Sequence, residues 1–299
     1  MIPRSAVHGL PPWTLAVAAM LAVQVANALS VSVIGHVGAG GTAWLRMCFG
    51  AAFLWLIARP DFRSIRRQDL PALIALGVVT GYMTALFLEA VARIPLGTAV
   101  SIEFLGPLTV AGIMSRNRKA LVWPLLAVIG VVLLTEPWHG EIDGAGVLFA
   151  LGAGTCWGLY NLLTQHVGDR FSGISGLSLT IPVAAIATLP VGLPQAIGGD
   201  FTWWVLPAAA GIALITPVIA FGLEMLALKR MNHNAFGTLL SIEPAFGVLM
   251  GLLVLAQTPT WFQILGIIIV VAAGAGAQRG GRRKGPDMAL TEVPADLPK

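Results

Sequence analysis

The sequence predicts an all-α membrane protein in which ten transmembrane helices form two inverted five-helix repeats. Three observations lead to this fold class: an extreme apolar composition, ten long apolar runs, and a motif that occurs once in each half of the chain. Of the 299 residues, 57% are apolar and 11% are charged, less than half of the roughly 25% charged residues usual in soluble domains. The composition excludes a soluble enzyme, a secreted disulfide scaffold and a disordered regulator. A formal charge of +4 is too small to indicate a nucleic-acid partner.

The ten apolar runs are bounded by polar or charged residues. Their limits are 13–34, 42–58, 71–92, 96–114, 121–135, 144–165, 174–193, 203–227, 234–256 and 261–277. A transmembrane helix needs about 20 residues, so the fifth run is short. The runs lack the two-residue alternation of membrane-spanning strands. The first run is long for a cleaved signal peptide, and we expect it to remain in the mature chain.

The positions of the basic residues predict the orientation. If the N terminus is cytoplasmic and the runs alternate in direction, sixteen of the 18 Lys and Arg residues lie on the cytoplasmic side. Arg93 alone lies on the opposite side, and Arg46 lies inside a span. This positive-inside bias favours an even number of spans with both termini in the cytoplasm. We therefore expect a multi-pass protein of the cell inner (cytoplasmic) membrane, with a disordered cytoplasmic tail at 279–299.

A repeated motif divides the chain into two halves. The segments 97–103 (GTAVSIE) and 237–243 (GTLLSIE) are identical at five of seven positions, and a Leu-Glu pair precedes each of them. Because five spans per half is an odd number, the two halves must be inverted. We expect the first five-helix repeat at 1–140 and the second at 141–278. Inverted repeats are typical of secondary transporters that work by alternating access, and the alternative is a duplicated structural bundle that moves nothing.

The ten spans, the two five-span repeats and the basic cytoplasmic loops together resemble the drug/metabolite transporter superfamily, in particular its EamA-type members. Two stretches carry the resemblance in detail. One is 89–107, with an Arg-Ile-Pro-Leu-Gly turn from Arg93 and a Glu-Phe-Leu-Gly-Pro helix from Glu103. The other is Ser241-Ile242-Glu243-Pro244-Ala245. The first also resembles the bacterial threonine and homoserine exporters of that superfamily. The resemblance implies a secondary-active exporter of small amino acids or related metabolites, coupled to protons.

Other functions stay open beside this one. An uncoupled facilitator or an importer of the same superfamily fits the same pattern. An intramembrane enzyme acting on lipid belongs to a different class, as does a non-transporting sensor or assembly partner. The chain has no phosphate loop, dinucleotide fingerprint or metal-ligand spacing. We therefore expect no enzyme activity and no cofactor or metal, and as partners a small-molecule substrate, protons, the lipid bilayer and a second copy in a possible homo-oligomer.

Two glutamates are the leading candidates for binding protons or substrate. Glu103 and Glu243 are repeat mates inside spans, where a charge costs at least ~2.5 kcal/mol and usually faces a cavity or a partner. Pro107 removes the amide that would bond to the carbonyl of Glu103, and Pro244 disfavours helical geometry at Glu243. Burial disfavours the charged form of a carboxyl group, which suits proton exchange. Alternatively, each acid is structural and bonds to a neighbouring hydroxyl of Ser101 or Ser241.

Four other charged residues lie in or near the spans. Glu89 and Arg93 are four residues apart, so we expect an ion pair that ends the third helix. Glu224, the repeat mate of Glu89, lacks such a partner and is a candidate for an inner gate with Lys229. Arg46 has three interpretations: it binds a substrate carboxylate through two parallel hydrogen bonds, pairs permanently with a glutamate, or points to the outer interface.

Two polar stripes complete the candidate site. Trp157, Tyr160 and Asn161 lie on the sixth span, and Asn27 lies between Gln24 and Ser30 on the first. In lipid such stripes turn towards other helices, where they bind substrate or form interhelical hydrogen bonds. The motifs Gly154-x-x-x-Gly158 and Gly247-x-x-x-Gly251 predict close helix packing.

Overall fold

The computed structural model describes residues 11–58, 66–114, 118–139, 143–167, 174–228, 230–231 and 233–280. All regular elements in these ranges are helical, which confirms the all-α fold class. The main helices are α2 (Pro12–Ala58), α3 (Leu70–Val91), α4 (Leu96–Met114), α5 (Val122–Thr135), α6 (Gly144–Val167), α7 (Ile174–Gly198), α8 (Val205–Ala213), α9 (Ala220–Leu228), α10 (His233–Leu240), α11 (Glu243–Leu255) and α12 (Trp261–Gly280). A short helical turn precedes α3 at Arg67–Asp69, and two more flank α5, at Arg118–Leu121 before it and Pro137–His139 after it.

Seven helical segments of the described chain are long and apolar enough to cross a membrane. Two shorter apolar helices, Lys119–Thr135 and Trp261–Ala277, match the fifth and tenth predicted runs. The first two predicted runs are joined in α2, whose 47 residues are interrupted only by the non-helical backbone of Gly38. The predicted tail falls largely outside the described residues, although α12 continues to Gly280.

Three helical stretches are interrupted. Gly38 breaks α2 with a positive φ of 72°, which glycine adopts without steric cost. Between α8 and α9 lies the π-helical turn η5 (Leu214–Ile219), in which Thr216 is extended (φ −141°, ψ 118°) just before Pro217. Ser241 and Ile242 separate α10 from α11. Two of these three breaks lie in the second half, close to the residues that form the candidate site.

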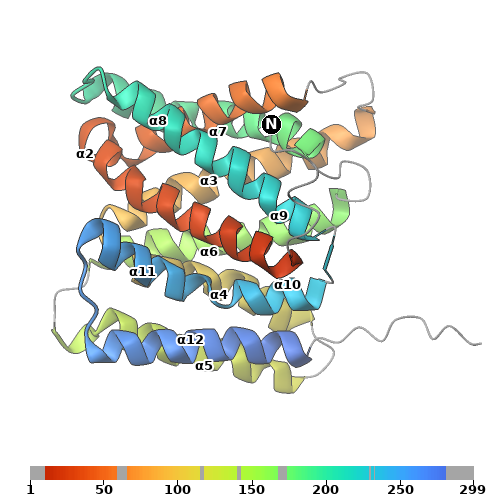
Figure 1. Cartoon of the computed structure of the whole chain (residues 1–299), viewed down its shortest axis with the longest axis vertical. Coiled ribbons are helices and arrows are strands. Elements are labelled where there is room, and N and C mark those ends of the chain that lie inside the picture. Colours follow the sequence, from red (N-terminus) through yellow and green to blue (C-terminus); the bar gives the residue numbers. More distant parts are fainter. Residues whose placement is uncertain are drawn as a thin grey trace, which may run out of the picture.

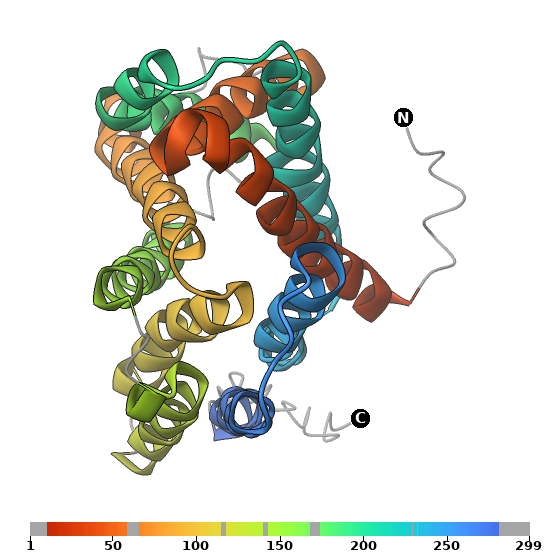
Figure 2. The ribbon, with the colours of Figure 1, turned by 90° about the vertical axis from the view of Figure 1, so that its left-hand side faces the viewer.

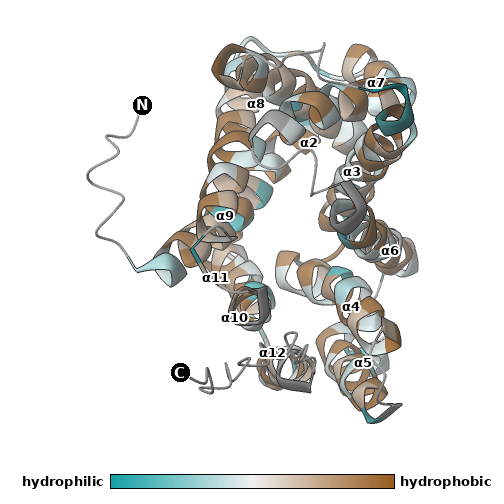
Figure 3. Cartoon of the chain, turned by 90° about the vertical axis from the view of Figure 1, so that its right-hand side faces the viewer, coloured by the Kyte–Doolittle hydropathy of each residue, from teal (hydrophilic) through white to brown (hydrophobic). Residues whose placement is uncertain are grey.

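The helices run side by side (Figure 1), and seen end on they form a ring (Figures 2 and 3). Along one side lie α2, α9 and α11, and along the other lie α3, α6 and α4. Contacts of α7 with α2 and α3 close the ring at one end, and contacts of α4 with α11 close it towards the other, where α5 packs against α12. Apolar residues predominate along the helices (Figure 3), and many large ones are exposed, as expected for surfaces that face lipid.

Glycines let the helices approach closely at the ring contacts. A Cβ atom on Gly106 of α4 would lie 1.8 Å from the carbonyl oxygen of Gly154 on α6. On α6, a Cβ atom on Gly158 would lie 2.9 Å from Cγ2 of Val110 on α4, and on α11 a Cβ atom on Gly247 would lie 2.9 Å from Cγ2 of Val100 and one on Gly251 would lie 3.7 Å from Cβ of Leu96, both on α4. The packing role predicted for both small-residue motifs is therefore confirmed.

We predict that Gly106→Ala destabilises the fold by about 1–3 kcal/mol, because the new methyl group meets backbone atoms that can move only if α4 and α6 separate. Unfolding of the purified protein in detergent measures this change. Gly222→Ala is the matched control, since a Cβ atom there meets nothing within 4 Å. Equal stability of the two variants would contradict the close contact.

Candidate functional site

A buried arginine links both halves of α2 to the break between α8 and α9. Arg46 is 5% exposed. Its Nη1 donates to Oδ1 of Asn27 at 3.1 Å, and its Nε donates to the carbonyl oxygen of Thr216 at 3.0 Å. That carbonyl is free to accept this bond because the backbone of Thr216 is not helical. Arg46 thus points into the protein, which contradicts the outer-interface interpretation, and it forms no ion pair with a described glutamate.

Two amides extend this network to Glu243. Nδ2 of Asn27 donates to Oε1 of Gln24 at 3.4 Å, and Nε2 of Gln24 donates to Oε1 of Glu243 at 3.2 Å. Glu243 is the first residue of α11 and is followed by Pro244, so its carboxylate lies where the helix dipole favours negative charge. Its second oxygen, Oε2, is buried without a hydrogen-bond partner among the described residues.

Glu103 lies opposite, on α4, and has a different environment. Its backbone packs against α6: a Cβ atom on Gly154 would lie 2.6 Å from the carbonyl oxygen of Glu103. Pro107 leaves that carbonyl without its helical donor, yet α4 continues unbroken. The Glu103 side chain is half-buried and makes no hydrogen bond or ion pair with a described residue. It is close enough to interact electrostatically with Glu243 and Arg46.

The structural alternative for the two acids receives no support from the neighbouring hydroxyl groups. Ser101 donates to the carbonyl oxygen of Gly97 at 2.7 Å, and Ser241 donates to that of Thr238 at 2.6 Å. Both hydroxyl groups therefore bond to the backbone of their own segment and not to the glutamates.

Glu224 of α9 belongs to the same group of charges. It is half-buried and interacts electrostatically with Glu243 and with Tyr160 of α6. Lys229, the partner suggested for an inner gate, lies outside the described residues. The surroundings of Glu224 thus differ from those of its repeat mate Glu89, which lies near the end of α3.

The stripe on α6 contacts the same region from the other side of the ring. Trp157 packs edge to face against Phe104 of α4, with ring centroids 6.1 Å apart. Tyr160 and Asn161 are half-buried. On α2, Ser30 is fully buried and bonds to the carbonyl oxygen of Ala26, so only Gln24 and Asn27 of that stripe join the network.

A second polar cluster lies at the end of α3. Glu89 and Arg93 form the ion pair predicted from their spacing, and the guanidinium group of Arg93 lies 4.8 Å from the ring centroid of Phe149. Gln195 of α7 connects this pair to α2. Its Nε2 donates to Oε1 of Glu89 at 3.4 Å, and its Oε1 accepts from the amide of Gly40 at 2.8 Å, just after the break at Gly38. The pair is therefore part of an interhelical contact as well as a helix end.

Sequence reasoning missed two residues, Thr216 and Gln195. The Thr216-Pro217 pair was a usable signal, because a proline inside an apolar run indicates a helix break that frees backbone groups. Gln195 carried no such signal, since its role depends on the position of a backbone amide 155 residues away. Among the described residues, no three His, Cys, Asp or Glu side chains are arranged to hold a metal ion.

Comparison with known proteins gives matches over most of the chain. Residues 144–276 match the EamA-like transporter family. The threonine/homoserine exporter of Salmonella typhimurium is 35% identical over 281 residues, which cover 92% of this chain and 95% of the exporter. The corresponding exporter of Escherichia coli K12 is 35% identical over 274 residues, covering 90% and 92%.

Two more distant matches agree. The pseudopaline exporter of Pseudomonas aeruginosa is 24% identical over 279 residues, covering 87% of this chain and 93% of that protein. A crystal structure with 17% sequence identity superposes with a TM-score of 0.61 over 90% of this chain and 99% of the other. At that identity the superposition shows a shared fold only.

We predict that Arg46→Met lowers the free energy of unfolding by about 1–3 kcal/mol, because it leaves the carbonyl oxygens of Asn27 and Thr216 buried without a donor. Arg93→Met, which removes a partly exposed ion pair, should cost less than about 1 kcal/mol. Denaturation in detergent compares the two variants directly, and a smaller loss for Arg46→Met would show that its hydrogen bonds are dispensable.

Proposed function

We propose an export function for this chain, because it belongs to the EamA-like transporter family within the drug/metabolite transporter superfamily. It is accordingly a multi-pass protein of the inner membrane and a transporter, not an enzyme. We propose that its substrate is a small amino acid such as threonine or homoserine, or a related metabolite. The observation that carries this proposal is the 35% identity, over most of both chains, to the threonine/homoserine exporters.

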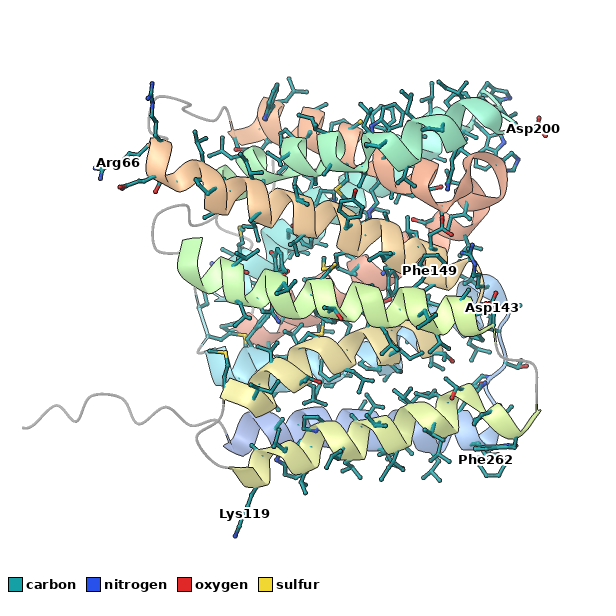
Figure 4. All side chains as sticks on the ribbon, turned by 180° about the vertical axis from the view of Figure 1, so that it is seen from behind. Arg66, Lys119, Asp143, Phe149, Asp200 and Phe262 are labelled. Atoms are coloured by element: carbon teal, nitrogen blue, oxygen red, sulfur yellow. The ribbon has the colours of Figure 1, made fainter. Side chains whose placement is uncertain are left out.

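We propose ten membrane crossings. The helix α2, at 47 residues, is long enough for two crossings of about 20 residues each. Six further segments of sufficient length and two shorter apolar helices supply the remainder. Charge at the two ends of the molecule supports the inside orientation of both termini: Arg66 and Lys119 lie at one end, and Asp143 and Asp200 lie at the other (Figure 4).

We propose that residues 1–140 and 141–278 are the inverted repeats and that residues 279–299 form a cytoplasmic tail. The contacts support this, because α2 packs on α7, α4 on α11, and α5 on α12, and each pair joins equivalent spans of the two halves. The glycines of the last pair are reciprocal: a Cβ atom on Gly130 would lie 2.7 Å from the carbonyl oxygen of Gly266, and one on Gly266 would lie 2.6 Å from that of Gly130. Such reciprocity is expected across a two-fold axis.

In the proposed mechanism, Glu103 and Glu243 bind protons or the substrate ammonium group. Glu103 supports this role because its carboxyl group has no partner among the described residues, and Glu243 because one of its oxygens is unpartnered. Arg46 is available to attract the substrate carboxylate, and Trp157, Tyr160, Asn161 and Asn27 would complete the surroundings of the substrate.

Alternating access would expose this group of residues first to the cytoplasm and then to the outside. The breaks at Thr216 and at 241–242 lie beside Arg46 and Glu243, where irregular backbone often forms transporter binding sites. The cluster of Glu89, Arg93 and Gln195 joins α3, α7 and α2 and is a candidate outer gate. Glu224 instead lies with the central acids Glu103 and Glu243.

The proposed topology predicts opposite labelling of two introduced cysteines. In a background without Cys48 and Cys156, Asp200→Cys should react with a membrane-impermeant maleimide on intact cells, because the basic end with Arg66 and Lys119 faces the cytoplasm and Asp200 lies at the other end. Lys119→Cys should react only after the cells are permeabilised. Labelling of both positions from the same side would contradict the orientation.

The function itself is tested by counterflow in proteoliposomes. Vesicles that contain the purified protein and unlabelled threonine or homoserine should accumulate the labelled amino acid from outside, whereas vesicles without protein should not. Absence of counterflow for every small amino acid would contradict the proposed substrate class.

Coupling to protons is tested in the same vesicles. We predict that Glu103→Gln or Glu243→Gln abolishes flux driven by a pH gradient while expression is unchanged, because neither amide can take up a proton in the working range. Asp143→Asn is the control, since among the described residues that carboxylate bonds only to amides at the start of α6. Wild-type coupled flux in both glutamate variants would remove these acids from the mechanism.

A further inference from the structure

The hydrogen bonds between Arg46 and Glu243 all point in one direction. A guanidinium group has donors and no acceptor, so the amide atom of Asn27 that faces it must be the oxygen. Asn27 must then present its nitrogen to the other side, where Oε1 of Gln24 accepts at 3.4 Å. Gln24 in turn presents its nitrogen to Oε1 of Glu243 at 3.2 Å. Because Arg46 can only donate, it sets the orientation of Asn27, and Asn27 sets the orientation of Gln24, which donates to the carboxyl group of Glu243.

Neither side-chain amide can flip by 180°, which would exchange its oxygen and nitrogen, while Arg46 keeps its position. A reversed Asn27 would place an NH₂ group against the guanidinium nitrogens, and a reversed Gln24 would place its NH₂ group against the NH₂ group of Asn27. Both side chains are buried, with Gln24 1% and Asn27 5% exposed, so bulk water cannot replace the lost partners. The direction of the relay is therefore fixed by Arg46, which the carbonyl oxygen of Thr216 also holds in place.

This direction distinguishes the two oxygens of Glu243. In this arrangement Oε1 faces a donor and acts as an acceptor. Oε2 is buried and has no hydrogen-bond partner among the described residues. A protonated carboxyl group carries its hydrogen on one oxygen only, and a hydrogen on Oε1 would meet the NH₂ group of Gln24.

We propose that Gln24 and Asn27 are positioning residues for Glu243, which hold Oε1 as an acceptor and direct the exchangeable proton to Oε2. This inference rests on the proposed proton-binding role of Glu243. It goes beyond that role, because it assigns the atom that binds the proton and adds Gln24 to the functional residues.

The other charged groups around Glu243 leave Oε2 open. Glu103 faces it from α4 and Glu224 from α9, and both are acids that interact with it through space. Arg46 of α2 reaches it only through the relay. The segment 261–277 of α12, which packs on α11, contains no titratable side chain.

Infrared difference spectroscopy of the full-length protein in lipid nanodiscs tests the assignment. The carboxylic C=O band that appears on acidification and is absent in Glu243→Gln belongs to this residue. In Gln24→Leu, the band should move to higher wavenumber, because its carbonyl oxygen, Oε1, no longer accepts a hydrogen bond. The midpoint of its pH titration should also move by about one pH unit, the size expected for one hydrogen bond to a charged group.

A second variant tests the relay through a residue that does not contact Glu243. Asn27→Asp keeps an acceptor for Arg46 but cannot donate to Gln24, so Gln24 should turn its nitrogen towards the new carboxylate and withdraw it from Glu243. The band should shift in the same direction as in Gln24→Leu. Ser30→Ala is the matched control, because Ser30 is buried on the same helix and, within the described part of the chain, its hydroxyl bonds only to Ala26.

Wild-type band position and midpoint in Gln24→Leu would overturn the proposal, as would a Glu243 band that is missing at every pH. A shift in Gln24→Leu without one in Asn27→Asp would overturn the role of Asn27. Because the spectra need no substrate, their outcome is separate from that of counterflow. A responsive band in a protein without amino-acid counterflow would contradict the proposed substrate class and leave the relay intact.

Discussion

A single guanidinium group buried among membrane helices governs the architecture of the candidate site. Lipid offers Arg46 no hydrogen bonds, so the protein must supply acceptors for it. One comes from Asn27 and the other from the backbone of Thr216, which is accessible only because the helix is broken there. The arginine therefore ties α2 to the interrupted part of the second half, and through two amides it also fixes how α11 presents Glu243.

The two repeat-related acids have diverged in their surroundings. Glu243 starts a helix after a break and accepts a hydrogen bond from Gln24, whereas Glu103 lies within an unbroken helix and has no partner in the described chain. A carboxyl group with a fixed donor and a helix N-terminus is held in one orientation. One without them is free to adapt to whatever binds beside it. We infer that the two halves contribute unequally, with Glu243 the more constrained and Glu103 the more adaptable acid.

Much of this was predictable from local sequence. Apolar runs gave the helix positions, the repeat singled out Glu103 and Glu243, and a spacing of four predicted the pair of Glu89 and Arg93. The rest depends on distant contacts that no local pattern encodes. Thr216 matters because its carbonyl meets Arg46, 170 residues earlier in the chain, and the joining of two predicted runs in α2 depends on the backbone of Gly38. The grouping of Glu224 with the central acids likewise arises only from packing.

We propose that Arg46, Glu103 and Glu243 surround one binding site. An experimental structure of the protein in lipid nanodiscs with bound threonine or homoserine tests it most directly. We expect density for the amino acid beside Glu103 and Glu243, with its carboxylate towards Arg46. Density elsewhere, for example beside Glu89 and Arg93, with the network from Arg46 to Glu243 unchanged, would contradict it.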